Sequence, residues 1–148
     1  TLSAVYGAIM RKTARENAFK LTFEQLIGGA RNELTYNALT SGFNEEDKLY
    51  LDTLLDGVTS EKAFLTKTIA SFARGFTEER IYKIDLAILL IATYEILFLP
   101  DVPDKVSVNE AVELAKTYST DNSPSFINGV LASVIKEKEN LLNERNED

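Results

Sequence analysis

Apolar residues follow one another almost without a break over residues 84–99, which read IDLAILLIATYEILFL. After the aspartate near the start, only Thr93, Tyr94 and Glu95 carry polar groups, so apolar side chains cover every face of a helix. The 14 residues after that aspartate are too few for a membrane span, which needs about 20. We therefore predict a central core helix that ends before Pro100, because the residue preceding a proline avoids the helical conformation.

Glu95 is the charged residue inside this apolar run. We expect its carboxylate to accept hydrogen bonds from a neighbouring helix, as buried polar groups usually do. A catalytic acid is the alternative that the sequence leaves open.

Shorter amphipathic segments flank the predicted core helix. A first helix begins near Arg11 and ends at the glycine pair 28–29, and residues 31–40 form a second, weaker helix. Asn44 is a good N-cap for a helix whose apolar face continues for about six turns, as far as Phe72. Gly57 inside this helix marks either close packing or a break.

Two further helices follow the core helix. Ser107 and Glu110 have the spacing of a capping box, and Ser123 followed by Pro124 has the pattern of an N-cap and a first helical residue. The charged tail after Leu142 is expected to fray. Strand alternation and glycine-rich phosphate loops are absent from the sequence, so we predict an all-α fold of about seven helices.

The composition excludes several kinds of chemistry. The chain has no cysteine, which excludes disulfides and thiolate metal sites, and no histidine, which removes the commonest general base and zinc ligand. No group of aspartate and glutamate residues has convincing metal-ligand spacing. We therefore expect no metal and no cofactor, with a carboxylate metal enzyme as the alternative that the composition leaves open.

Charge is distributed unevenly along the chain. The net charge is −7, yet residues 1–20 carry +3, so the remaining 128 residues carry −10. Arg11, Lys12, Arg15 and Lys20 supply the positive charges against Glu16. Cations at the start of a helix gain nothing from the helix dipole, so the cluster indicates a function, with a solvated helix end as the alternative.

The ends of the chain suggest its organisation. Residues 1–9 are apolar and precede the basic cluster, which is the wrong order for a signal peptide. Met10 is the only methionine, so we expect residues 1–9 to be an extension, residues 10–142 to be the functional domain and residues 143–148 to be a charged tail. With no targeting or membrane segment in the sequence, we expect a cytoplasmic protein.

Several blocks resemble, in order and spacing, the NusB family of bacterial transcription antitermination factors. These blocks are RKTARENAFKLTF, LLDGV, IDLAILLIATYEI, VPDKVSVNEAVELAKTYS and SPSFINGVL, and they extend from about Met10 to Lys136. The resemblance implies a fold of two packed helical bundles without catalysis. It also implies pairing with NusE, a small-subunit ribosomal protein, binding of the pair to boxA sequences of leader and ribosomal RNA, and an indirect association with RNA polymerase.

The resemblance also assigns the basic opening of the chain. The family's RNA-binding opening matches Arg11, Lys12 and Arg15, which we expect to be exposed, to contact phosphates and to matter little for the fold. A nearby family position, tyrosine or phenylalanine, is Phe23 here. Packing in the core is its simpler role, and stacking on an RNA base is the alternative.

A loop and an acidic residue complete the expected site. The family's RNA-contacting loop matches Asn122, Ser123, Ser125 and Phe126. Asp85 keeps the acidic character of its family position, and we expect it to meet NusE, with simple helix capping as the alternative.

Other functions remain open at this stage. The family's fold is also fused to ribosomal RNA cytosine methyltransferases, of which this chain would be a fragment. A helical interaction domain or homodimer without direct RNA binding is a further alternative. Light scattering, together with RNA binding measured with and without NusE, would separate these functions.

Overall fold

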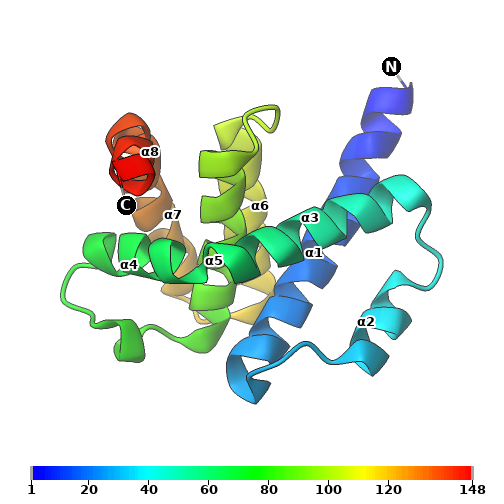
Figure 1. Cartoon of the computed structure of the whole chain (residues 1–148), viewed down its shortest axis with the longest axis horizontal. Coiled ribbons are helices and arrows are strands. Elements are labelled where there is room, and N and C mark those ends of the chain that lie inside the picture. The colour runs from blue at the N-terminus through cyan, green and yellow to red at the C-terminus, as the bar shows by residue number, and fades with distance from the viewer. Residues whose placement is uncertain (1, 148) are drawn as a thin grey trace.

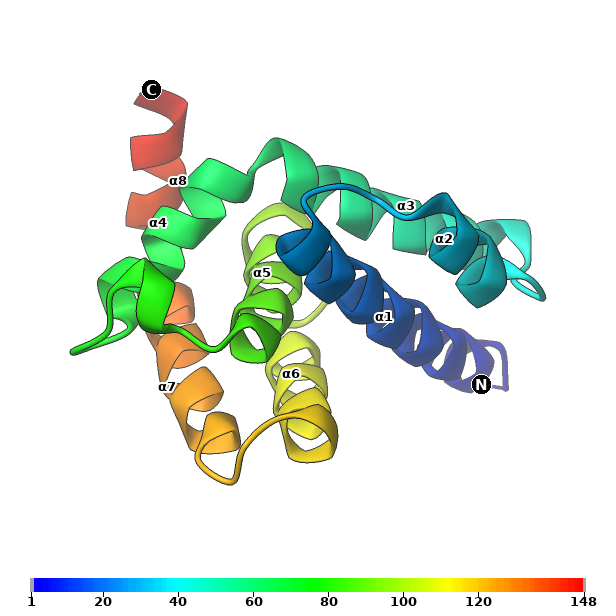
Figure 2. The same cartoon turned by 90° about the horizontal axis from the view of Figure 1, so that it is seen from below.

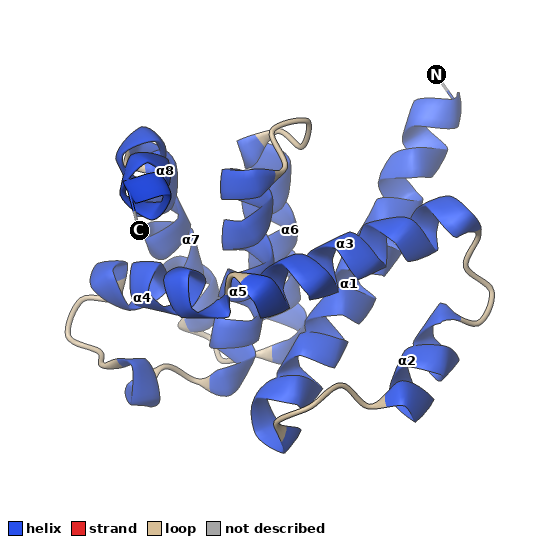
Figure 3. Ribbon diagram, viewed as in Figure 1, coloured by secondary structure: helices blue, strands red, loops and turns tan. Residues whose placement is uncertain are grey.

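The computed structural model describes the backbone of residues 2–147 and the side chains of residues 11–77 and 79–147. This part of the chain is entirely helical, which confirms the predicted all-α class (Figure 1, Figure 3). The helices are α1 (Leu2–Gly28), α2 (Glu33–Thr40), α3 (Glu45–Ser60), α4 (Lys62–Phe72), α5 (Lys83–Phe98), α6 (Asp104–Tyr118), α7 (Ser123–Lys136) and α8 (Lys138–Glu147). A short 3-10 helix, η1 (Glu78–Arg80), precedes α5. No helix of the described residues is both long and apolar enough to cross a membrane.

α5 lies between two groups of helices (Figure 2). α1, α2 and α3 lie on one side, and α4, α6, α7 and α8 lie on the other. α5 packs against α1, α3, α4, α6, α7 and α8. Apart from Tyr94, all residues of 85–97 are buried. The prediction of a central core helix flanked by two bundles is therefore confirmed.

The predicted six-turn helix is divided in two. α3 ends at Ser60, α4 begins at Lys62, and the N–H of Glu61 between them donates to the carbonyl oxygen of Gly57 at 2.9 Å. Buried apolar residues continue on both sides of the break, with Val58 before it and Leu65 after it. The helical spacing of apolar residues continues across the bend between α3 and α4, so this spacing alone could not predict the bend.

The predicted capping box is wrong, and the charged tail is helical as far as Glu147. α6 begins at Asp104, so Ser107 lies in its first turn, and the Ser107 side chain is buried instead of capping the helix. α8 is anchored at both ends, because Lys138 binds Asp104 at 2.8 Å and Arg145 forms an ion pair with Glu61. These contacts explain why a strongly charged tail remains helical.

Gly57 allows α3 to pack closely against α5. A Cβ atom at this position would overlap the ring of Tyr94, which is itself packed on Phe98 with ring centroids 5.1 Å apart. Gly57→Ala is therefore expected to lower the free energy of unfolding by about 1–3 kcal/mol, although alanine is the better helix former. Urea unfolding measures the change.

Gly129→Ala is the matched control for this substitution. Gly129 lies inside α7, is exposed, and its added Cβ would have no neighbouring atom within 4 Å. Here alanine should raise the free energy of unfolding by up to about 1 kcal/mol. Equal gains at both glycines would contradict close packing of Gly57 on Tyr94.

Candidate nucleic-acid interface

Two of the three predicted phosphate-binding cations lie on the surface of α1. Arg11 and Lys12 are exposed. The guanidinium of Arg11 lies over the ring of Tyr50, 5.7 Å from its centroid, and Nζ of Lys12 is 3.7 Å from a carboxylate oxygen of Glu110 on α6. Both charges reach solvent, so both can meet an anionic ligand.

Arg15 is buried, so the prediction that it is exposed is wrong. Its side chain is 4% exposed, and its Nε and Nη2 donate to the two carboxylate oxygens of Glu95 at 2.9–3.0 Å. The Glu95 side chain is completely buried in α5 and requires a compensating cation, which α1 supplies. The expectation that a neighbouring helix satisfies Glu95 is confirmed.

Tyr50 from α3 joins this buried ion pair. Its hydroxyl donates to Glu95 and accepts a hydrogen bond from Nη2 of Arg15 at 3.1 Å. Burial raises the pKa of Tyr50 and the charge of Glu95 adds to this effect, so the hydroxyl keeps the proton that it donates. Burial opposes the charge of Arg15, but attraction to Glu95 and the hydrogen bonds with it prevail and raise the pKa of Arg15.

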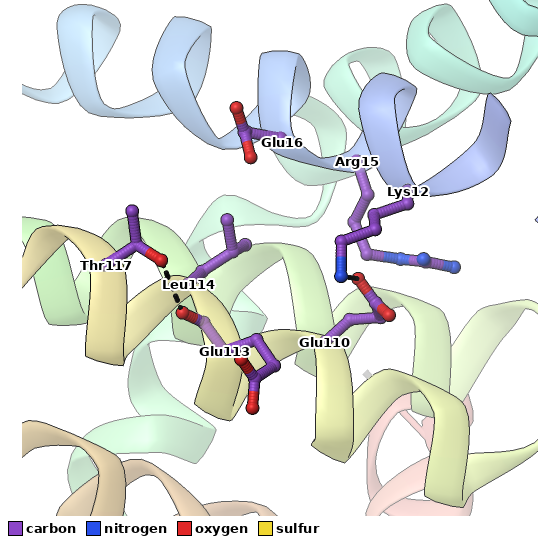
Figure 4. A pocket seen from close by; sticks show the side chains of 7 residues that line it. All are labelled: Lys12, Arg15, Glu16, Glu110, Glu113, Leu114 and Thr117. Atoms are coloured by element: carbon purple, nitrogen blue, oxygen red, sulfur yellow. Dashed lines mark hydrogen bonds and ion pairs between the residues drawn. The ribbon is translucent and has the colours of Figure 1, made fainter. Parts of the chain in front are cut away.

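A small cleft of about 70 Å³ lies between α1 and α6, beside Lys12 (Figure 4). Lys12 and Glu110 point toward one another across it. Further along α1, Glu16 accepts a hydrogen bond from the hydroxyl of Tyr118 at 3.1 Å and forms an ion pair with Lys20 at 3.5 Å. α1 begins at Leu2 and not near Arg11 as expected, so the basic residues lie within the helix. Polar contacts between α1 and α6 extend from Lys12 toward the C-terminal half of α1.

A larger groove of about 510 Å³ lies beside the α6–α7 loop. All four predicted loop residues, Asn122, Ser123, Ser125 and Phe126, line it, and so does Asp85. Asn122 and Ser125 are exposed, and the ring of Phe126 meets Phe76 edge-on with centroids 5.6 Å apart. The structure thus brings polar groups and aromatic rings together at an open surface.

Asp85 and Ser123 line the same groove, but both side chains are almost fully buried, unlike the open placement expected of contact residues. Asp85 is 3% exposed, and its two carboxylate oxygens accept hydrogen bonds from the hydroxyls of Ser119 at 2.5 Å and Ser123 at 3.0 Å. The charge of Asp85 and the hydroxyl of Ser123 are thus engaged in hydrogen bonds within the protein. Both side chains instead hold the α6–α7 loop on the start of α5 and thereby position Asn122 and Phe126.

Phe23 lies at a second groove of about 410 Å³, which also includes Ile27, Tyr82 and Tyr118. Phe23 is half-buried and packs against the core, as its simpler interpretation expects. Tyr82 lines both grooves and therefore joins them.

Sequence interpretation missed one segment of this surface. Phe76, Arg80 and Tyr82 all line the 510 Å³ groove, and Lys83 lines its neighbour. The segment 74–83, RGFTEERIYK, is rich in cations and aromatic residues, and this density is the signal that could have identified it.

Taken together, the fold and site define a class of protein: a helical double bundle with exposed cations beside grooves lined by aromatic side chains. Cations that hold a backbone and aromatic rings that stack on bases are typical of single-stranded nucleic-acid binding. Within the described residues, no group of three or more acidic side chains is placed to hold a metal ion.

Comparison with known proteins identifies the family. The sequence model of the NusB family matches residues 8–136, so the chain belongs to the NusB family. A transcription antitermination protein NusB from Clostridium novyi is 42% identical over 134 residues, covering 85% of this chain and 98% of the relative. NusB from Acetivibrio thermocellus is 42% identical over 130 residues, covering 86% of this chain and 90% of that protein.

Solved structures agree with this assignment. NusB of T. maritima matches with a TM-score of 0.81 at 26% identity, over 90% of this chain and 96% of that chain. A chain from a structure of antitermination factors NusB and NusE in complex with dsRNA has the same fold, with a TM-score of 0.77 at 21% identity over 86% of this chain and 96% of that chain. The sequence resemblance to the NusB family is therefore confirmed.

Proposed function

We propose that this chain is a cytoplasmic, non-catalytic antitermination factor that pairs with NusE and binds boxA-type single-stranded RNA. The observation that carries the proposal is the exposure of Arg11 and Lys12 on a chain of net charge −7. Evenly distributed acidity would repel RNA, so a local basic surface is what a phosphate backbone requires. The relatives named above are transcription antitermination proteins, which favours this role over a methyltransferase fragment.

RNA is expected to follow α1 toward the two grooves. Arg11 and Lys12 would hold phosphates, while the groove with Phe76, Phe126 and Asn122 offers aromatic faces and an amide to unpaired bases. Bases can be recognised only where they are unstacked. A surface on which cations hold phosphates and aromatic rings meet bases therefore suits a single strand.

The partner is expected at the second groove. Ile27 and Tyr82 beside it are 65% and 64% exposed, an unusual exposure for large side chains next to one another in a groove. The 128 residues that follow the basic segment carry −10, which suits a basic partner. NusE is the partner proposed because a protein of this fold has been solved together with it.

Arg11→Ala combined with Lys12→Ala tests the RNA surface. With NusE held constant, the double variant should bind RNA more weakly across sequences, because the lost contacts are to phosphates. The slope of the logarithm of its RNA affinity against the logarithm of salt concentration should become shallower by about 1.4, at roughly 0.7 for each lost phosphate contact to a single strand. Fluorescence anisotropy at several salt concentrations measures both quantities, and the melting temperature should barely change.

The matched control removes two exposed lysines elsewhere. Lys67 lies on α4 and Lys136 at the C-terminal end of α7, two helices on the opposite side of α5 from α1, and replacing both lysines by alanine changes the net charge equally. This control should leave the affinity and salt slope nearly unchanged. Equal behaviour of the two double variants would move the RNA surface to the groove around Asn122 and Phe126.

A further inference from the structure

We infer that Glu110 competes with RNA phosphate for Lys12 and thereby limits how tightly this chain holds RNA. The inference rests on the proposed function, since it concerns the same basic surface. It gives a role to Glu110, which belongs to the NEAVELAK block of α6 and takes no part in the helix cap predicted for it.

The geometry places the carboxylate opposite a cation that RNA must reach. Nζ of Lys12 is 3.7 Å from Oε2 of Glu110, across the cleft between α1 and α6 (Figure 4). The Lys12 side chain is 56% exposed, whereas the Glu110 side chain is 22% exposed. The cation is thus accessible from solvent, while the competing carboxylate is held in the cleft wall.

The other two carboxylates of the cleft face different cations. Glu16 forms its ion pair with Lys20 at 3.5 Å, and Glu113 forms its ion pair with Lys116 at 3.4 Å. Glu110 is paired with Lys12. Among the acids of this cleft, Glu110 is therefore the one whose ion pair involves a residue of the proposed RNA surface.

A phosphate that binds Lys12 must displace this contact. The carboxylate of Glu110 then lies within a Debye length of the phosphate, about 8–10 Å at ordinary salt, and the two charges repel. Exposed ion pairs contribute little each, so the effect on affinity is modest, roughly two- to fivefold. Because Lys12 contacts the RNA backbone, competition from Glu110 weakens binding to all RNA sequences alike. Discrimination between sequences then depends on contacts to the bases and on the partner.

Glu110→Gln tests the inference by an expected gain in binding. The amide has nearly the same shape without the charge, so RNA affinity should rise about two- to fivefold, equally on boxA and scrambled RNA. The dependence of RNA affinity on salt concentration should become steeper. In the unchanged protein, a phosphate that binds Lys12 frees the carboxylate of Glu110, which takes up a cation and so reduces the net release of ions. The glutamine variant lacks this uptake. A gain of affinity cannot be attributed to partial unfolding, which would lower it.

Glu113→Gln and the Lys12→Ala background provide the controls. Glu113 lies one turn from Glu110 in the same cleft, and its substitution changes the net charge equally, so it reports the general electrostatic effect. In the Lys12→Ala background, Glu110→Gln should give no more gain than Glu113→Gln does in the otherwise unchanged protein.

The possible outcomes separate the inference from the function on which it rests. A gain with Glu110→Gln that exceeds the gain with Glu113→Gln and disappears without Lys12 supports the competition. Equal gains for the two variants, or a gain that persists without Lys12, overturn it while leaving RNA binding established. If the unchanged protein with NusE binds neither RNA, the proposed function itself fails.

Discussion

Arg15→Ala is expected to lower the free energy of unfolding by about 3–5 kcal/mol, because it leaves the carboxylate of Glu95 buried without its cation. Arg15 and Glu95 are joined by three hydrogen bonds of 2.9–3.0 Å, and Tyr50 binds both. The small effect expected of an exposed RNA-contacting residue therefore does not apply to Arg15. Urea unfolding at neutral pH measures the loss.

Two further variants test the cause of this loss. Arg11→Ala, one turn earlier on α1, removes an exposed guanidinium and should cost no more than about 1 kcal/mol. Replacing Arg15 by Met and Glu95 by Leu together should cost less than removing either partner alone, since no unpaired charge is then buried. If Arg15→Ala costs as little as Arg11→Ala, the ion pair does not contribute to the core.

Ile91→Ala is expected to lower the free energy of unfolding by about 2–5 kcal/mol. Ile91 is 1% exposed in α5, which packs against both groups of helices, so truncation leaves a cavity that surrounding helices can only partly fill. Leu49→Ala is the matched control, because Leu49 on α3 is 68% exposed and should change stability by roughly 0.5 kcal/mol or less. Similar losses at the two positions would show that α5 is not the centre of the core.

The core helix could be predicted from sequence because its apolar pattern leaves no polar face. Residues 84–99 were expected to be helical, and α5 spans Lys83–Phe98. The bend at Glu61 has a weaker signal. Gly57, where a break was considered, lies four residues before it, and buried apolar residues continue on both sides. Similarly, the helical order of the charged tail depends on contacts of Arg145 and Lys138 with distant residues.

The pairing of Arg15 with Glu95 could not be predicted from the sequence. Arg15 lies between the buried Ala14 and Ala18 on α1, and Glu95 lies in an apolar helix, so each is unusual in its own surroundings. Their pairing spans 80 residues and is determined by helix packing. A local count of charge assigns Arg15 to the basic surface with Arg11 and Lys12, whereas the structure assigns it to the core.

The loop region was predicted only in part, because sequence identifies the loop residues themselves but not the distant residues that pack beside them. Asn122 and Phe126 reach an open groove as expected, because they occupy the loop before α7 and its first turn. The contribution of Phe76 and Tyr82 depends on how the segment between α4 and α5 returns to the core, which no local pattern specifies. Asp85 carries the expected charge, but the hydroxyls of the α6–α7 loop engage it.

The most direct test of the proposed function is the affinity of the unchanged protein for RNA with NusE present. Fluorescence anisotropy at physiological salt would compare a boxA single strand with a scrambled strand of identical composition, so that phosphate contacts are equal and only base recognition differs. We predict binding to both RNAs and a roughly tenfold or greater preference for boxA, equivalent to about 1.4 kcal/mol. Equal affinities for the two strands, or binding to neither, would contradict the account.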